Sequence, residues 1–339
     1  MTDQLMRMIL SKWISKPIYA AAELGIADLL ARGPMSSDEL ARLTGTRPDA
    51  LYRVLRALAS VGIFAEGEDD GEERCFRLTP MALLLQSGSL RSTALSFNAE
   101  WNDRAWMHLL EGLRRGCTPF EEAFGESFFD WLESNPHQAE LLRQANASRA
   151  DQFRRALCEA YDFSRFSTLT DLGGGSGELL QQILLANPAL RGTLADLASV
   201  LPEARKTLEA AGVGERCAVV ECDFFRSVPA GSDAYLLANV LHDWPDERAG
   251  LILENCRRAM APGSALLVVE MIIPPGNEPS AAKLLDLEML VVTGGRERSE
   301  GEFRSLLAAA ELSLERVIPI GQELFILEAA PRRYAALPG

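Results

Sequence analysis

A glycine-rich turn in the second half of this 339-residue chain has the composition of a ligand-binding loop. It runs from Asp171 to Gly177 as Asp-Leu-Gly-Gly-Gly-Ser-Gly, and glycines let a backbone approach a ligand closely. The turn lacks the last glycine of the dinucleotide fingerprint, because position 178 is Glu178, and no Gly-Lys-Ser/Thr of a phosphate loop follows. Asp171 would repel a pyrophosphate and would suit a cationic ligand. A tight turn without a ligand is the alternative.

Two further acidic residues could hold a nucleoside. Asp196 ends the next apolar run, where an acid is the usual partner of the two ribose hydroxyls. Asp223 ends a third run and could accept a hydrogen bond from an adenine amino group, while the adjacent Phe224 could stack on the base. Each residue alone could be a helix cap or part of the core. Three acids at the ends of successive strands together predict a nucleoside site.

His242, one of three histidines in the chain, is the candidate general base. Its unperturbed pKa of about 6.5 lets an imidazole accept a proton near neutral pH. Two later acids, Glu270 and Glu297, could orient it. The alternatives are a structural histidine and, for Glu297, a solvated surface charge.

All of these residues except Glu297 lie at or just after predicted strands of one sheet. From about residue 167, apolar runs alternate with helical stretches, the pattern of a parallel doubly wound α/β sheet, in which ligands bind beyond the carboxyl ends of the strands. The predicted strands are 168–171, 193–196, 217–222, 234–238 and 265–270, with two late runs at 312–320 and 323–327.

The first 100 residues predict helices followed by a hairpin. A capping box over 36–39 starts a helix that should end at Gly45. After a second helix, strands at 63–65 and 75–78 flank an acidic turn, which completes the order of a winged-helix domain. A wing that reads DNA would be basic. The segment is therefore predicted to be a packing or dimerisation module.

Composition excludes several classes of protein. The chain has 48 acidic and 34 basic residues, a net charge of −14, and 47% hydrophobic residues. The acidic balance argues against nucleic-acid binding, and no apolar run reaches the length of a membrane span. The N-terminus lacks the pattern of a secretory signal, and the six cysteines are scattered, so we expect a cytoplasmic protein with reduced thiols and no metal.

The motifs, taken in order, resemble those of the plant-type S-adenosylmethionine-dependent O-methyltransferases, most of all the bacterial branch that modifies aromatic natural products. They are DLGGGSG at 171–177, the acid at 196, DFF at 223–225, VLHDWPDE at 240–247 and GGRERSEGEF at 294–303. The resemblance covers nearly the whole chain.

The resemblance implies three parts and an intertwined homodimer. A winged-helix-like dimerisation domain would occupy 1–100, a helical linker that contributes to the acceptor pocket 101–165, and a Rossmann-like catalytic domain 166–339.

The resemblance also implies a role for each candidate residue. His242 would be the general base, flanked by Glu270 and Glu297. The residues implied to bind the cofactor are Asp171, Gly173, Gly175, Asp196, Leu197, Asp223, Phe224 and Asn239. The residues implied to line the pocket for an aromatic acceptor are Trp106, Met107, Phe124 and Asn146. Ala238 departs from the pattern, because many plant relatives have a lysine there, and this leaves the adenosine contacts open.

Two other functions are compatible with these motifs. The same fold and cofactor could support methylation of nitrogen or carbon, hydroxylation or decarboxylation. A DNA-binding regulator that senses the cofactor is the non-enzymatic alternative, and the acidic wing argues against it.

Overall fold

The computed structural model describes residues 1–68, 74–321 and 323–332. The chain divides into two compact units. Unit 1 comprises Met1–Met107 and Glu126–Asp151, and unit 2 comprises His108–Gly125 and Gln152–Gly339. Within the described ranges, no helix is both long and apolar enough to cross a membrane.

Unit 1 is helical apart from a small antiparallel sheet with the strand order β1-β3-β2, in which β2 and β3 form the predicted hairpin. Its elements are α1 (Thr2–Ile9), α2 (Lys12–Glu23), α3 (Ile26–Leu30), β1 (Met35–Ser36), α4 (Ser37–Thr44), α5 (Pro48–Ser60), β2 (Phe64–Glu68), β3 (Arg74–Leu78), α6 (Pro80–Leu83), α7 (Arg91–Phe97), α8 (Glu100–Met107), α11 (Phe128–Ser134) and most of α12 (Pro136–Ala160).

The predicted capping box begins helix α4. The backbone N–H of Glu39 donates to Ser36 Oγ at 3.3 Å, and the N–H of Ser36 donates to the Glu39 carboxylate at 2.9 Å. The helix ends at Gly45 with φ +67°, which glycine adopts without steric cost. Most of the acidic turn, residues 69–73, lies outside the described residues. The order helix, helix, hairpin is confirmed.

Unit 2 is an α/β unit. Its elements are α9 (Leu109–Arg115), α10 (Pro119–Phe124), the end of α12, η1 (Phe163–Arg165), β4 (Thr168–Leu172), α13 (Glu178–Ala186), β5 (Arg191–Asp196), α14 (Leu201–Ala210), η2 (Gly214–Arg216), β6 (Cys217–Glu221), β7 (Ala234–Ala238), η3 (Leu241–Asp243), α15 (Asp246–Ala259), β8 (Ala265–Met271), α16 (Ala281–Val292), α17 (Glu300–Ala309), β9 (Leu312–Pro319) and β10 (Leu324–Pro331).

The sheet of unit 2 has seven strands in the described part of the chain, in the order β6-β5-β4-β7-β8-β10-β9. Strands β4 to β8 are parallel, which confirms the doubly wound pattern. Strand β10 runs antiparallel to both β8 and β9, so the sheet is mixed. The short connection between β9 and β10 is a hairpin, whereas a parallel pair needs a long crossover. Strands β5 and β6 are added on one side of β4, and β7 and β8 on the other. In sheets of this kind, ligands bind at such a switch point, beyond the carboxyl ends of the strands, here β4 and β7.

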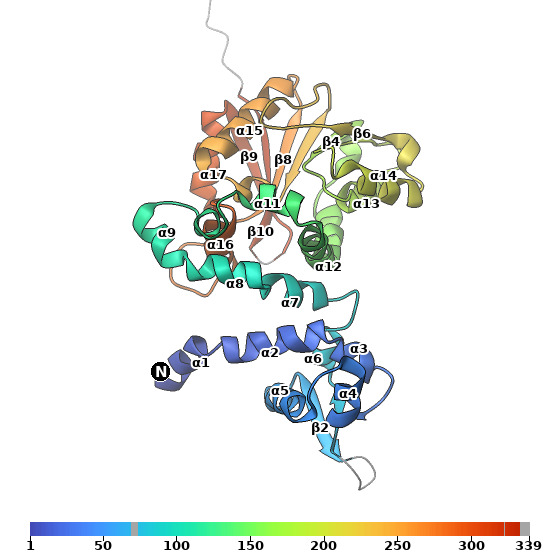
Figure 1. Ribbon diagram of the computed structural model, residues 1–339. Coiled ribbons are helices and arrows are strands. Elements are labelled where there is room, and N and C mark those ends of the chain that lie inside the picture. The colour runs from blue at the N-terminus through green and yellow to red at the C-terminus, as the bar shows by residue number, and fades with distance from the viewer. Residues whose placement is uncertain (69–73, 322, 333–339) are drawn as a thin grey trace, which may run out of the picture. The chain divides into compact units, whose positions relative to one another are not determined.

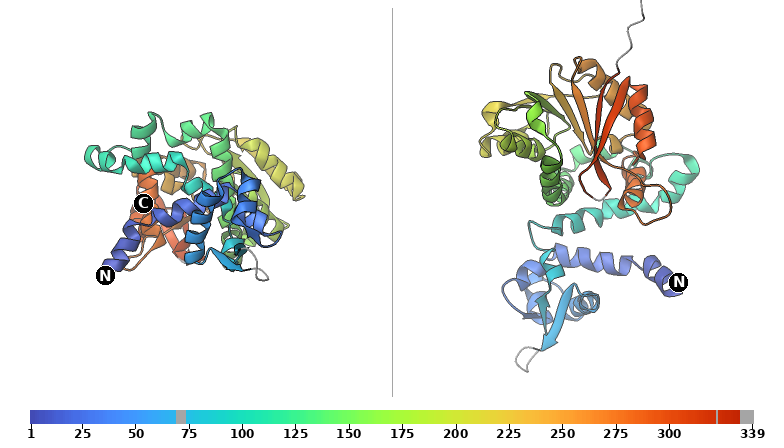
Figure 2. Two further views of the ribbon diagram at one scale, coloured as in Figure 1. Left: turned by 60° about the horizontal axis from the view of Figure 1, so that its bottom comes forward. Right: turned by 180° about the vertical axis from the view of Figure 1, so that it is seen from behind.

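Helices cover both faces of this sheet (Figures 1 and 2). Successive side chains of a strand point to opposite faces. Accordingly, Tyr235 and Leu237 of β7 pack in one core with α15 and α17, whereas Leu236 packs in the other core with α13 and α14. The parallel strands β5, β4, β7 and β8 therefore lie between two apolar layers, and the carboxyl ends of the parallel strands present most of the candidate residues.

Candidate functional site

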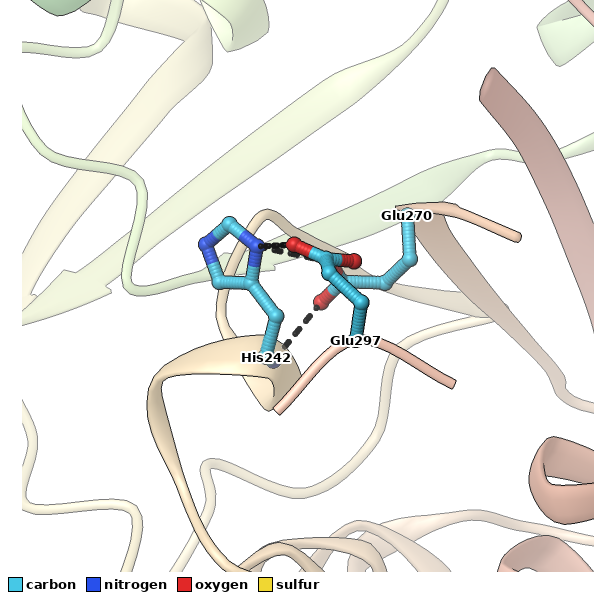
Figure 3. A group of neighbouring side chains, drawn as sticks. All are labelled: His242, Glu270 and Glu297. Carbon is cyan, nitrogen blue, oxygen red and sulfur yellow. Dashed lines mark hydrogen bonds and ion pairs between the residues drawn. The ribbon is translucent and has the colours of Figure 1, made fainter. Parts of the chain in front are cut away.

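Three residues far apart in the sequence meet beyond the ends of β7 and β8 (Figure 3). His242 lies in η3, the turn after β7. Glu270 lies near the end of β8, and Glu297 lies in the loop between α16 and α17. The imidazole Nδ1 of His242 is 2.7 Å from Glu297 Oε1 and 3.5 Å from Glu270 Oε2. The structure therefore brings together the three predicted catalytic side chains.

The Glu270 carboxylate also holds the backbone that carries His242. Its Oε1 accepts hydrogen bonds from the N–H groups of Val240 at 3.1 Å and Leu241 at 2.8 Å, and lies 3.4 Å from that of His242. The preceding Asn239 has φ +53°, a left-handed conformation that asparagine tolerates better than most residues. This turn aims successive N–H groups at one oxygen, so Glu270 fixes the position of the turn as well as facing the imidazole.

Carboxylates determine the charge of His242. Burial alone would lower the pKa of this imidazole, but the surrounding acids, of which Glu270 contributes most, outweigh burial and raise the pKa of His242 to about 10. Burial raises the pKa of Glu270 to about 7, although His242 acts in the opposite direction. In the protein alone, the surrounding acids therefore favour the imidazolium over the neutral ring.

The contact between His242 and Glu297 selects which ring nitrogen can exchange a proton. Both carboxylates lie on the Nδ1 side, so Nδ1 keeps its hydrogen and donates it to Glu297. The other nitrogen, Nε2, is 3.8 Å from Asp243 Oδ1. The His242 side chain is 13% exposed, so it is not fully enclosed by the protein. This arrangement suits proton transfer at Nε2.

The glycine-rich turn after β4 is organised around two acids. Gly173 and Gly175 have φ +68° and +56°, values that favour glycine. The N–H of Gly175 donates to Asp196 Oδ2 at 2.9 Å, and that of Leu197 donates to Asp196 Oδ1 at 2.7 Å. A Cβ at Gly174 would lie 2.8 Å from Asp171 Oδ2. The turn thus passes directly over both carboxylates, which lie at the ends of neighbouring strands.

Asp171 has the unsatisfied charge of this turn. Its side chain is 1% exposed, and Oδ2 has no hydrogen-bond partner among the described residues. Burial, helped by the charge of Asp196, raises the pKa of Asp171 to about 7. A buried polar atom without a partner costs free energy, and a cationic ligand would remove that cost. The site therefore fits a positively charged cofactor.

The segment Asp223–Phe225 lies against the same turn. A Cβ built on Gly173 would lie 3.5 Å from Cε1 of the Phe224 ring and 3.1 Å from Val240. The N–H of Phe225 donates to Asp223 Oδ1 at 3.0 Å. The predicted adenine-binding residues are thus brought next to the glycines and to the turn that carries His242.

The four predicted acceptor-pocket residues are divided between the units. Trp106, Met107 and Asn146 belong to unit 1, and Phe124 belongs to unit 2. Met107 is 80% exposed, and the Phe124 ring stacks on Phe120 with centroids 4.4 Å apart. Their role in binding an acceptor stays a prediction.

Two supporting residues escaped the sequence analysis. Asp286 accepts a hydrogen bond from the N–H of Glu297 at 2.8 Å, and the fully buried Arg298 donates to the segments on both sides of the site. Arg298 belongs to the quoted motif, and its position next to Glu297 was the only signal. The side chains of His242, Glu270 and Glu297 also lie within 4.8 Å of one another, which the scattered positions did not reveal. The absence of a metal stays a prediction.

Known proteins share this architecture. Residues 106–313 match the O-methyltransferase domain family, and residues 6–88 match the O-methyltransferase dimerisation domain family. The chain is 45% identical to a phenazine O-methyltransferase from Lysobacter antibioticus, over 96% of this chain and 95% of that protein. It is 34% identical to a phenazine-1-carboxylate N-methyltransferase from Pseudomonas aeruginosa, with 96% of each chain covered. A neocarzinostatin-biosynthesis O-methyltransferase, solved with S-adenosylmethionine and 2-hydroxy-5-methyl naphthoic acid, superposes with a TM-score of 0.82 at 30% identity, covering 94% of this chain and 96% of that one.

Proposed function

Because the chain belongs to the S-adenosylmethionine-dependent O-methyltransferase family, we propose that it methylates a hydroxyl group of an aromatic small molecule in natural-product biosynthesis, with His242 as the general base. The observation that carries this proposal is the 2.7 Å contact between His242 Nδ1 and Glu297 Oε1. It leaves Nε2 to accept a proton, which a phenolic oxygen must lose because its pKa is near 10.

Residues of the chain would accept the hydroxyl proton and stabilise the positive charge that results. When bound, S-adenosylmethionine supplies an electrophilic methyl group on a sulfonium ion. His242 Nε2 would accept the hydroxyl proton as the oxygen–methyl bond forms and the methyl–sulfur bond breaks. The carboxylates of Glu270 and Glu297 would stabilise the resulting imidazolium, which then returns its proton to water.

Binding of a cationic cofactor would convert His242 into its basic, neutral form. In the protein alone, the raised pKa keeps His242 protonated. A cation bound at the neighbouring glycine turn favours the neutral imidazole, because like charges repel, and so lowers the pKa of His242. The base would therefore form when the cofactor binds.

Each cofactor residue would meet a different part of the ligand. The Asp171 carboxylate, which lacks a partner on Oδ2 among the described residues, would face positive charge. Asp196 can accept the ribose hydroxyls on the lone pairs that its two backbone contacts leave free. Asp223 and Phe224 would hold the adenine. Leu197, Asn239, Gly173 and Gly175 would supply the surrounding backbone.

The acceptor would be an aromatic hydroxy compound, in line with the phenazine and naphthoic acid named for the relatives. We assign Trp106, Met107, Phe124 and Asn146 to its pocket. Unit 1 would form a homodimer, which the match to a dimerisation domain supports. Exposed Leu5, Ile9 and Trp13 repeat along α1 and α2 as an apolar stripe. We also place the protein in the cytoplasm.

The first test is thermal unfolding with S-adenosylhomocysteine, with NAD as the control. A ligand at about 100 times its Kd stabilises a fold by roughly 2.7 kcal/mol, so Tm should rise with the first compound alone. Hydroxyphenazines and hydroxynaphthoic acids are then incubated with S-adenosylmethionine, and the products are analysed by mass and NMR. Absence of an O-methyl product from every hydroxy acceptor would contradict the proposal.

A nitrogen acceptor is the second candidate, favoured by the 34% identity to an N-methyltransferase over nearly the full chain. Matched pairs of hydroxy and amino aromatics decide between the two. A neutral amine or ring nitrogen attacks without first losing a proton, so its methylation should not depend on His242. If His242→Ala loses turnover with the hydroxy compound and keeps it with the amino compound, the result supports methyl transfer to oxygen with His242 as the base.

A further inference from the structure

Arg298 occupies a position that connects the segments carrying the three site residues. Its side chain is 0% exposed although it is charged. Taking a charge out of water costs several kcal/mol, and a single ion pair seldom offsets that cost. Its acid partner, Asp246 at 2.9 Å, is itself 57% exposed. The remaining donors of the guanidinium must therefore account for this burial.

Those donors all point to main-chain carbonyls beside the site. Nη1 donates to the carbonyl oxygen of Leu241 at 3.0 Å, and Nη2 donates to that of Trp244 at 2.8 Å. Leu241 is the first residue of η3 and Trp244 follows its last, so both carbonyls belong to the turn that carries His242. A further bond of 3.3 Å runs from Nη1 to the carbonyl of Arg296, next to Glu297. One planar group thus spans the His242 and Glu297 segments.

The backbone around Arg298 completes this connection. Its carbonyl accepts from the N–H of Ile273 at 3.0 Å, just after β8 and Glu270. The N–H of Arg296 donates to the carbonyl of His242 at 2.8 Å. A Cβ at Gly295 would lie 2.1 Å from that same carbonyl oxygen, so only glycine lets the two segments approach so closely.

We propose that Arg298 is a positioning residue, which sets the distance between His242 and Glu297 by fixing η3 against the loop that carries Glu297. Its planar guanidinium offers five donors in a fixed arrangement, which lysine cannot reproduce. Without it, η3 would be free to move away from Glu297, and misplacement by about 1 Å can cost roughly 100-fold in rate. This inference rests on the proposed function, because it assumes that His242 is the base.

Arg298→Lys tests the proposal because lysine keeps the charge and loses the planar fork. We expect kcat to fall about 10- to 100-fold, while KM for S-adenosylmethionine stays near the wild-type value. The limb of the pH–kcat profile should move to lower pH, because a looser contact with Glu297 stabilises the imidazolium less. Asp246→Asn, which weakens the ion pairs of this half-exposed acid with Arg298 and Arg296 and leaves the carbonyl contacts of Arg298 in place, should show the same changes at smaller amplitude.

Arg216 provides the matched control. Its guanidinium also donates to three main-chain carbonyls, those of Leu184, Asn187 and Leu190, but in the layer of α13 and away from His242. Arg216→Lys should lower Tm as Arg298→Lys does and leave kcat and its pH profile unchanged. Equal losses of kcat in the two variants would show that Arg298 acts only through stability.

A readout without turnover separates this inference from the proposed function. The chain has three histidines, so His242 can be followed by NMR with labelled histidine. In folded Arg298→Lys, the titration of His242 should shift to lower pH. An unchanged His242 titration overturns the positioning role, even if no acceptor has been found. A shifted titration without O-methylation of any acceptor would contradict only the proposed function.

Discussion

The two polar clusters at the carboxyl edge of the sheet differ in how much of their charge the protein itself satisfies. Around His242, the protein supplies both signs: an imidazolium, two fully buried carboxylates and a series of N–H donors. Around the glycine turn, Asp171 and Asp196 lie close together, and backbone N–H groups are the only donors that reach Asp196 within hydrogen-bond distance in the described residues. The first cluster contains a cation of its own, although Glu270 Oε2 and Glu297 Oε2 have no hydrogen-bond partner among the described residues, whereas no cationic side chain of the described residues pairs with the acids of the second.

This difference separates two kinds of function. A cluster that contains its own cation and backbone donors keeps its geometry whether or not a ligand is bound, as positioning a proton acceptor requires. Buried acids that have no cation of the protein beside them cost free energy until a cation binds, and this cost favours a positively charged ligand over a neutral one. The comparison predicts that changes in the first region alter turnover and that changes in the second alter cofactor affinity.

Removal of the base should have the largest effect. In His242→Ala, we expect kcat with a hydroxy acceptor to fall about 100- to 10,000-fold, the usual contribution of general-base catalysis. The Kd of S-adenosylhomocysteine, measured by calorimetry, should stay near the wild-type value because the glycine turn is intact. Unchanged turnover would remove His242 from the mechanism, and a large loss of affinity would show that the two regions are not separate.

Changing the second region should reverse this pattern. Asp196→Ala removes a carboxylate that could accept both ribose hydroxyls, and hydrogen bonds to a charged group are worth about 1.5–3 kcal/mol each. We expect the Kd of S-adenosylhomocysteine to rise about 10- to 100-fold, with kcat at saturating cofactor largely retained. An unaltered Kd would mean that Asp196 serves only to hold the turn.

Glu297→Gln should change both the rate and its pH dependence. The carboxylate stabilises the imidazolium, so its removal lowers the pKa of His242 from about 10. Activity needs the neutral imidazole and rises with pH through that pKa. The rising limb of kcat/KM should therefore move to lower pH. The loss of a charge-assisted bond should lower kcat about 10-fold. A limb that moves to higher pH would contradict the assigned charges.

The features that could be predicted from the sequence are those that require particular residue types at particular positions. Strands are visible as apolar runs, and Asp171, Asp196 and Asp223 stand at their ends, where the proposed nucleoside site needs carboxylates. The capping box of Ser36 and Glu39 was equally visible, because it depends on contacts three residues apart. Local rules and ligand chemistry therefore gave these features.

The supporting structure was less visible because its partners are main-chain atoms or distant residues. Glu297 meets His242 across 55 residues, and no local pattern gives that pairing. Arg298 binds carbonyl oxygens, which every residue has, so its partners leave no trace in residue types. The sequence predicts β9 and β10 as strands, but it does not show that β10 pairs with β8, and only this pairing makes the sheet mixed.

The smallest effect should be a gain in stability at the glycine turn. The pKa of Asp171 is raised by burial to about 7, from an ordinary value near 4. The folded protein therefore holds this proton more tightly than the unfolded chain, so stability is lost as pH rises through that interval.

Asp171→Asn removes the charge that causes this loss, and we expect the Tm of the ligand-free protein to rise by a few degrees at pH 8 and to change little at pH 4.5. About 2–4 °C corresponds to each kcal/mol for a unit of this size. The control is Asp162→Asn, since burial of Asp162 is negligible and its pKa is lowered by hydrogen bonds from Ser164, so this variant should not gain stability at pH 8.

The same Asp171→Asn change should weaken binding of S-adenosylmethionine, the sulfonium form, more than that of the uncharged thioether S-adenosylhomocysteine. If Asp171→Asn destabilises the protein at pH 8, the carboxylate is already satisfied without a ligand, and the contrast between the two regions is wrong.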